Sequence, residues 1–75
     1  MVKVGIIGVG TVGSSVALIL ERNKEIIKAR AGKEIVAKLG IAKDRTKTHK
    51  DVKIPISQNI DDVINDPEID IVVEL

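Results

Sequence analysis

Apolar positions along the chain first form a continuous run and then recur with a helical period. Residues 2–7 are almost all apolar and mostly β-branched, which is typical of a strand buried on both faces of a parallel sheet. From Thr11 the spacing predicts one long helix that reaches Arg30, with Gly32 as the left-handed residue just beyond it. The apolar face of this helix is expected to carry Val12, Val16, Ile19, Leu20, Asn23 and Ile27.

The second half of the chain predicts shorter elements. Residues 35–42 read as another strand, with Gly40 as a bend or a point of close contact. Alternation over residues 52–56 predicts an edge strand, because Pro55 has no N–H for a central ladder. A short helix follows, capped by Asn59, with Ile60, Val63 and Ile64 as its apolar stripe. Asp66 and Pro67 end it, and residues 69–73 form a last buried strand.

This order of elements predicts an α/β fold, a Rossmann-like parallel sheet with flanking helices and right-handed crossovers. The 75 residues make one structural unit at most, about half the length of an ordinary domain. No repeat, linker or low-complexity segment divides the chain.

The composition of the chain argues against several classes of binding function. Twelve Lys and Arg against 11 Asp and Glu leave a net charge of +1, and there is no aromatic residue. The chain therefore has neither the basic footprint of a nucleic-acid or anionic-membrane binder nor a platform for stacking bases. It has no cysteine and a single histidine, His49, so no metal site is expected.

An uncharged run at residues 4–20 resembles a membrane segment at first sight. Four glycines interrupt it and it is short for a span, so it is read as a strand followed by a helix. A cytoplasmic protein is expected.

The turn between the first strand and the first helix carries the strongest functional signal. Gly8, Gly10 and Gly13 form G-x-G-x-x-G, and a buried strand ends where the motif begins. Gly8 would allow the tight turn, Gly10 the close approach of a pyrophosphate, and Gly13 close packing of helix on strand. The N–H groups near Thr11 and Val12 would then face the phosphates. The alternative is a glycine-rich turn that binds nothing; a P-loop is excluded because no Gly-Lys-Ser/Thr follows.

The residue that reads the ribose has two candidate positions. Glu34 has nearly the expected spacing from the motif, but it begins the second strand, whereas ligands bind beyond the carboxyl ends of parallel strands. Topology therefore favours Lys43, Asp44 and Arg45. Asp44 would accept hydrogen bonds from the hydroxyl groups of an adenosine ribose and favour NAD. Lys43 or Arg45 would instead bind a 2′-phosphate and favour NADP. Because Lys47 and Lys50 add positive charge, NADP is the preferred cofactor and NAD the alternative.

No catalytic set is visible. His49 is read as a solvated loop residue, and the acidic residues near the short helix as parts of its surface. Glu74 ends the last strand at the ligand-facing edge and is placed to approach the nicotinamide half of a cofactor.

These motifs together resemble the amino terminus of homoserine dehydrogenases. The resemblance rests on residues 4–13, on the helix positions Val16, Leu20, Asn23 and Ile27, and on Arg30-Ala31-Gly32. The ending Asp66-Pro67-Glu68-Ile69-Asp70-Ile71-Val72-Val73-Glu74-Leu75 is similar to the family's next segment, so the likeness covers the whole chain.

The resemblance implies reduction of aspartate 4-semialdehyde to homoserine with NADPH or NADH, on the route to threonine and methionine. It implies that Gly10, Thr11 and Val12 hold the cofactor phosphates and that Lys43 meets the adenosine phosphate. Residues 1–75 would then be a partial NAD(P)-binding domain, inactive alone, since the family's catalytic residues, substrate domain and homo-oligomer interface come later. The alternatives are another NAD(P)-dependent reductase, a non-catalytic NAD(P)-sensing module, or a fragment that binds no nucleotide.

Overall fold

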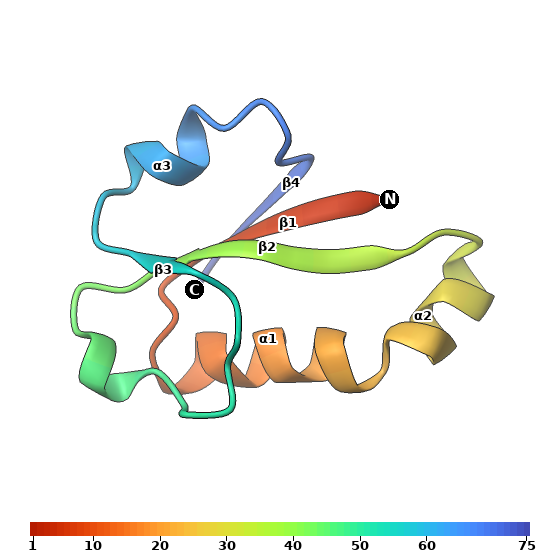
Figure 1. The fold of residues 1–75 in the computed structure, drawn as a ribbon, viewed down its shortest axis with the longest axis horizontal. Helices are drawn as coiled ribbons and strands as arrows, with labels where there is room; N and C mark the ends of the chain where they lie inside the picture. The colour runs from red at the N-terminus through yellow and green to blue at the C-terminus, as the bar shows by residue number, and fades with distance from the viewer.

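A four-stranded parallel sheet forms the centre of the computed structural model, which describes residues 1–75 (Figure 1). Its strands lie in the order β3-β2-β1-β4, so the chain crosses over the sheet between each parallel pair. The predicted α/β architecture is confirmed. The elements are β1 (Val2–Ile7), α1 (Thr11–Arg22), α2 (Lys24–Ala31), β2 (Ile35–Ile41), the 3₁₀ turn η1 (Arg45–Lys47), β3 (Ile56–Ser57), α3 (Asp61–Ile64) and β4 (Ile71–Glu74).

The helices lie on both faces of the sheet. Figure 1 shows α1 and α2 below it and α3 above it. The core is packed between the sheet and α1, with Ile6 and Val9 fully buried at its centre. On the opposite face, Val63 of α3 is buried against Gly5, where a Cβ would lie 2.7 Å from the Val63 side chain. None of the helices is both long enough and apolar enough to cross a bilayer.

The single long helix predicted from Thr11 is wrong, because the helix breaks at Asn23. The backbone N–H and the side-chain amide of Asn23 both donate to the Ile19 carbonyl, each at 3.0 Å. An asparagine side chain competes in this way with the helical ladder, and here it ends α1 and starts α2. The predicted Gly32 terminus is confirmed by its left-handed φ of 76°.

The predicted apolar face of the first helix is wrong at two of its six positions. The other four, Val16, Leu20, Asn23 and Ile27, are partly buried, and Val16 packs against the core. Val12 and Ile19 are 65% and 57% exposed, and the buried residues of α1 are the small ones, Gly13, Ser14 and Ala17. A Cβ on Gly13 would lie 2.2 Å from the Gly8 carbonyl oxygen. At the glycine-rich turn the helix therefore approaches the strand so closely that a side chain on Gly13 would not fit between them.

Two predicted strands are shorter than expected. Val52 and Ile54 pack against the core without pairing, and only Ile56–Ser57 joins the sheet, at its edge. The last strand begins at Ile71 instead of residue 69, because Ile69 closes a turn by donating to the Asp66 carbonyl. The N-cap residue of α3 is Ile60 and not the predicted Asn59, although the side-chain oxygen of Asn59 accepts from the Asp61 N–H at 3.0 Å.

The sequence did not predict an irregularity in β2 at Lys38. Val4 pairs with Ala37 and Gly5 with Leu39, so Lys38 has no partner in β1. Such a bulge reverses the faces of the residues that follow it. Ala37 and Gly40 consequently both face α1, and a Cβ on Gly40 would lie 2.5 Å from the Val9 side chain, which confirms Gly40 as a point of close contact.

Candidate functional site

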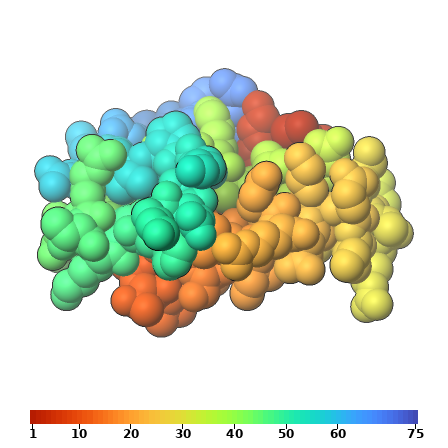
Figure 2. Space-filling view, turned by 60° about the horizontal axis from the view of Figure 1, so that its bottom comes forward, coloured from red at the N-terminus to blue at the C-terminus, as the bar shows by residue number.

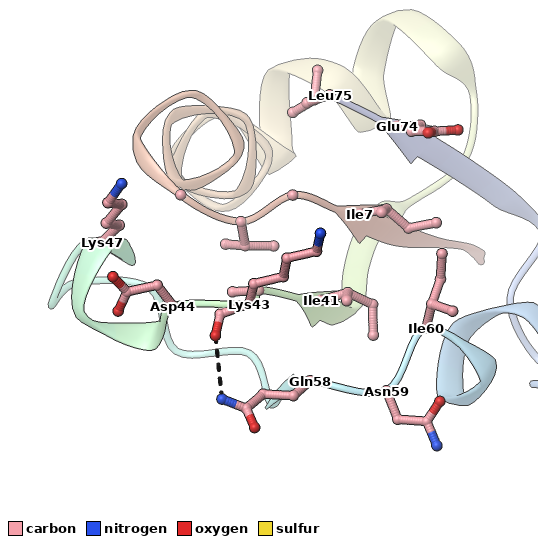
Figure 3. Close-up of a pocket in the computed structure, with 14 residues that line it drawn as sticks. Ile7, Ile41, Lys43, Asp44, Lys47, Gln58, Asn59, Ile60, Glu74 and Leu75 are labelled. Atoms are coloured by element: carbon pink, nitrogen blue, oxygen red, sulfur yellow. Dashed lines mark hydrogen bonds between the residues drawn. The ribbon is translucent and has the colours of Figure 1, made fainter.

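A cleft of about 790 Å³ opens at the carboxyl ends of the strands (Figure 3). This is the edge of a parallel sheet at which ligands bind, and the volume suits a small-molecule cofactor. Its lining comes from every strand end: Ile7, Gly8, Val9, Gly10, Ile41, Ala42, Lys43, Asp44, Lys47, Gln58, Asn59, Ile60, Glu74 and Leu75.

The three motif glycines occupy different environments, and Gly8 and Gly10 form part of the inner wall of this cleft. Gly8 has a φ of +96° and makes the turn, and its N–H and that of Val9 both donate to the Ile41 carbonyl at 2.8 Å. Gly13 lies against the Gly8 carbonyl, as described above. At Gly10 the space is open: the nearest atom to a Cβ would be the Cβ of Lys47, at 3.9 Å. Gly10 thus leaves room beside the backbone for a ligand.

The amino terminus of α1 presents unpaired donors next to that space. The first helical hydrogen bond is donated by Ser14 to the Gly10 carbonyl at 3.0 Å. The N–H groups of Thr11 and Val12 have no acceptor in the chain. Free N–H groups at the positive end of a 12-residue helix attract anionic oxygen atoms, so this end of the cleft suits a phosphate. Thr11 and Val12 do not themselves line the cleft, so their N–H groups lie at its margin, next to Gly10.

The polar residues after β2 divide between the cleft and the surface. Lys43 and Asp44 line the cleft together with Lys47, and Arg45 does not. Figure 3 shows the Lys43 side chain extending from the end of β2 toward the glycine-rich turn. One Asp44 oxygen accepts from Thr46 Oγ1 at 2.5 Å and from the Thr46 N–H at 3.0 Å. These bonds from Thr46 lower the pKa of Asp44, so the carboxylate stays charged while it caps η1.

Sequence reasoning missed the outer wall of the cleft. Gln58, Asn59 and Ile60 follow β3 and line the cleft opposite the glycine-rich turn. The Gln58 amide donates to the Lys43 carbonyl at 3.3 Å, which joins this wall to the end of β2. A signal was present: these residues follow a predicted parallel strand, and the rule that selected Lys43 applies to them equally.

Other predicted positions lie where topology placed them. Glu34 precedes β2, at the opposite end of the strands from the cleft, and its carbonyl accepts from Val2 N–H. Glu74 lines the cleft at the end of β4. His49 is half-exposed, and its Nδ1 accepts from the Asp51 N–H at 3.0 Å.

Comparison with known proteins now adds an independent finding. A family profile described as "Homoserine dehydrogenase, NAD binding domain" matches residues 8–75. The chain belongs to the homoserine dehydrogenase family. It is 49% identical over 97% of its length to a homoserine dehydrogenase of Helicobacter pylori, and 48% identical over 99% to one of Pseudomonas aeruginosa. The chain spans 17% of the length of each of these relatives, so it corresponds to their NAD-binding portion.

Solved homoserine dehydrogenases share the fold. A structure of the Staphylococcus aureus enzyme superposes with a TM-score of 0.84 at 31% identity, over 97% of this chain and 19% of that one. The Thiobacillus denitrificans enzyme gives the same TM-score at 39% identity, over 97% of this chain and 17% of that one. The resemblance stated from the sequence is confirmed, and the sheet described here is the first part of the family's Rossmann-like domain.

Proposed function

We propose that this homoserine dehydrogenase family chain binds the dinucleotide in the cleft at the carboxyl ends of its strands. Gly8, Gly10 and Gly13 shape the phosphate-binding turn, and the N–H groups of Thr11 and Val12 donate to the phosphates. The observation that carries the proposal is the open space at Gly10 beside two unpaired N–H groups, which a phosphate fits and a side chain would fill.

Of the two cofactors, NADP fits the charges of the cleft better. Lys43 lies in the cleft and extends toward the glycine-rich turn, and Lys47 lines the same cavity. Asp44, the residue that would favour NAD, has one oxygen occupied by Thr46. Arg45 lies outside the cleft and is the weaker candidate for a 2′-phosphate.

The whole-protein activity we propose is reduction of aspartate 4-semialdehyde to homoserine, in threonine and methionine biosynthesis. The bound coenzyme would supply the hydride. The residues described here would bind and orient it, with Glu74 facing the nicotinamide half. Residues 1–75 would act as a partial nucleotide-binding domain, with substrate binding and homo-oligomer formation assigned to other parts of the protein. A cytoplasmic site of action is part of this proposal and rests on family membership.

The test is a titration of the full-length natural protein with NADPH and with NADH, followed by nicotinamide fluorescence and by calorimetry. Replacing Gly10 with Val should abolish saturable binding. Lys43→Ala should weaken NADPH about tenfold, the usual size of one charge-assisted contact, and NADH much less. Lys33→Ala is the matched control, because Lys33 is exposed and lies outside the cleft.

Two outcomes would contradict the proposal. If folded protein binds neither nucleotide by both methods, the cleft is not a dinucleotide site. If Arg45→Ala lowers NADPH affinity more than Lys43→Ala does, the 2′-phosphate is held from outside the cleft and the assignment of Lys43 is wrong.

A further inference from the structure

The loop after β2 is attached to the glycine-rich turn by two side-chain hydrogen bonds. We call residues 43–50 the basic loop, since four of the eight are Lys or Arg. Thr48 Oγ1 donates to the Val9 carbonyl at 2.6 Å, and the His49 N–H donates to Ser14 Oγ at 2.9 Å. Figure 2 shows the segment that follows β2, in green and teal, packed against the orange atoms of α1.

Both acceptors are rigid parts of the phosphate-binding turn. Val9 is fully buried between the first two motif glycines, and Ser14, 2% exposed, directly follows the third. The Ser14 N–H donates to the Gly10 carbonyl. The glycine-rich turn therefore holds Ser14 in place, and the Ser14 side chain in turn holds the loop. The loop is therefore held against residues that cannot move without disturbing the helix start.

The attachment decides where Lys47 lies. Its Cβ would be the nearest neighbour of a Cβ on Gly10, at 3.9 Å, and Lys47 lines the cleft. Upstream of Lys47, Asp44 caps η1 through Thr46; downstream, Thr48 and His49 bind the turn. The backbone at Lys47 is thus fixed on both sides, with the Cβ of Lys47 beside the open space at Gly10.

We propose that Thr48 and Ser14 are positioning residues that set dinucleotide affinity by holding Lys47 at the phosphate-binding turn, without themselves contacting the cofactor. This inference rests on the proposed function. It deepens it by assigning the Lys47 ammonium to the cofactor phosphates and by naming the groups that keep it there. A lysine on an unattached loop would lose more conformational freedom on binding and would bind the same phosphate more weakly.

The test is a double-mutant cycle on the full-length natural protein, with NADPH affinity measured by titration. Thr48→Val, which keeps the shape and removes the hydroxyl, should weaken binding about fivefold, the equivalent of one hydrogen bond. Thr48→Ser, which keeps the donor, should restore wild-type affinity. Combined with Lys47→Ala, the Thr48→Val change should add nothing further, because it acts through that lysine.

A purely structural role for Thr48 would give a different result. The losses of affinity caused by Thr48→Val and by Lys47→Ala would then multiply in the double variant, or Thr48→Val would bind NADPH like the wild type. Either result overturns the inference and leaves the proposed function in place. If Thr48→Val fails to fold, Ser14→Ala replaces it in the same cycle, since alanine favours the helix. If the wild type binds no nucleotide, both proposals fail.

Discussion

The glycines of the turn differ in what a side chain would meet, which is backbone at Gly13 and open space at Gly10, where we propose that a cofactor phosphate binds. We expect Gly13→Ala to lower the free energy of unfolding by about 3 kcal/mol, because its Cβ would overlap the backbone carbonyl of Gly8. Gly10→Ala should change that free energy by less than about 1 kcal/mol, since its Cβ meets open space, yet weaken NADPH binding more than tenfold. Urea unfolding and titration of the two variants separate these effects. Equal loss of stability in both would show that Gly10 also serves packing.

At the scale of elements, ion pairs from Lys3 of β1 and Lys38 of β2 join the segment before β4 to these two strands. Lys38, the unpaired residue of β2, lies 2.5 Å from Asp66 and 3.5 Å from Glu68, and Lys3 of β1 lies 2.6 Å from Glu68. The Lys38 hydrogen bond lowers the pKa of Asp66, the Lys3 hydrogen bond lowers the pKa of Glu68, and the Asp66 hydrogen bond raises the pKa of Lys38.

These shifts predict a specific pH dependence of stability. A carboxyl group whose pKa is lowered by folding stabilises the fold at pH values above its ordinary pKa, which is near 4. This stabilisation is lost as the pH falls below that value and through the lowered pKa. Lys38, whose pKa is raised, contributes its full stabilisation at pH values below its ordinary pKa of 10.5, and this stabilisation is lost as the pH rises above that value. We expect Lys38→Met to lower the Tm at pH 6, and we expect this effect to shrink progressively as the pH falls from 6 to 3. Lys33→Met, which removes a lysine without an ion pair, should show no such change. A Tm difference for Lys38→Met that stays constant from pH 6 to pH 3 would exclude the pairs as its source.

At the scale of the whole molecule, β4 leaves one edge of the sheet open. It is the outermost strand on its side, and Ile71 and Val72 are 48% and 45% exposed. An exposed apolar edge strand is a template for pairing with another chain. The 75-residue chain by itself should therefore self-associate in sedimentation experiments as its concentration rises. Val72→Lys should reduce this association, whereas Ile26→Lys, a change at a 57% exposed residue of α2, should not. If the two lysine substitutions reduce association equally, association does not use the β4 edge.

The order and type of the elements were predictable because each depends on local pattern. Three signals each fix the structure of only a few neighbouring residues. They are the β-branched run of β1, the glycine at the end of α2 and the G-x-G-x-x-G turn. Placing Lys43 and rejecting Glu34 needed only the rule for parallel strands, and both lie where that rule put them.

The errors arise where distant contacts override the local pattern. Helical spacing included the large residues Val12 and Ile19 in the inner face of α1, but both are exposed, because the helix turns its small residues toward the strand where the two come close at Gly8. The bulge at Lys38 has no local signature, since it depends on how β2 pairs with β1. Val52 and Ile54 alternate like a strand, but they pack against the core instead of pairing.

The sequence by itself determined the α/β class, the glycine-rich turn and the family, because these depend on residue type and on spacing over short stretches. Tertiary structure alone decided which face of α1 is buried, where β2 changes face, and that Thr48 and Ser14 attach the basic loop to the turn. The two hydrogen bonds of the loop join residues 39 and 35 positions apart in the chain. Only folding brings such residues within hydrogen-bond distance, so no local pattern encodes them.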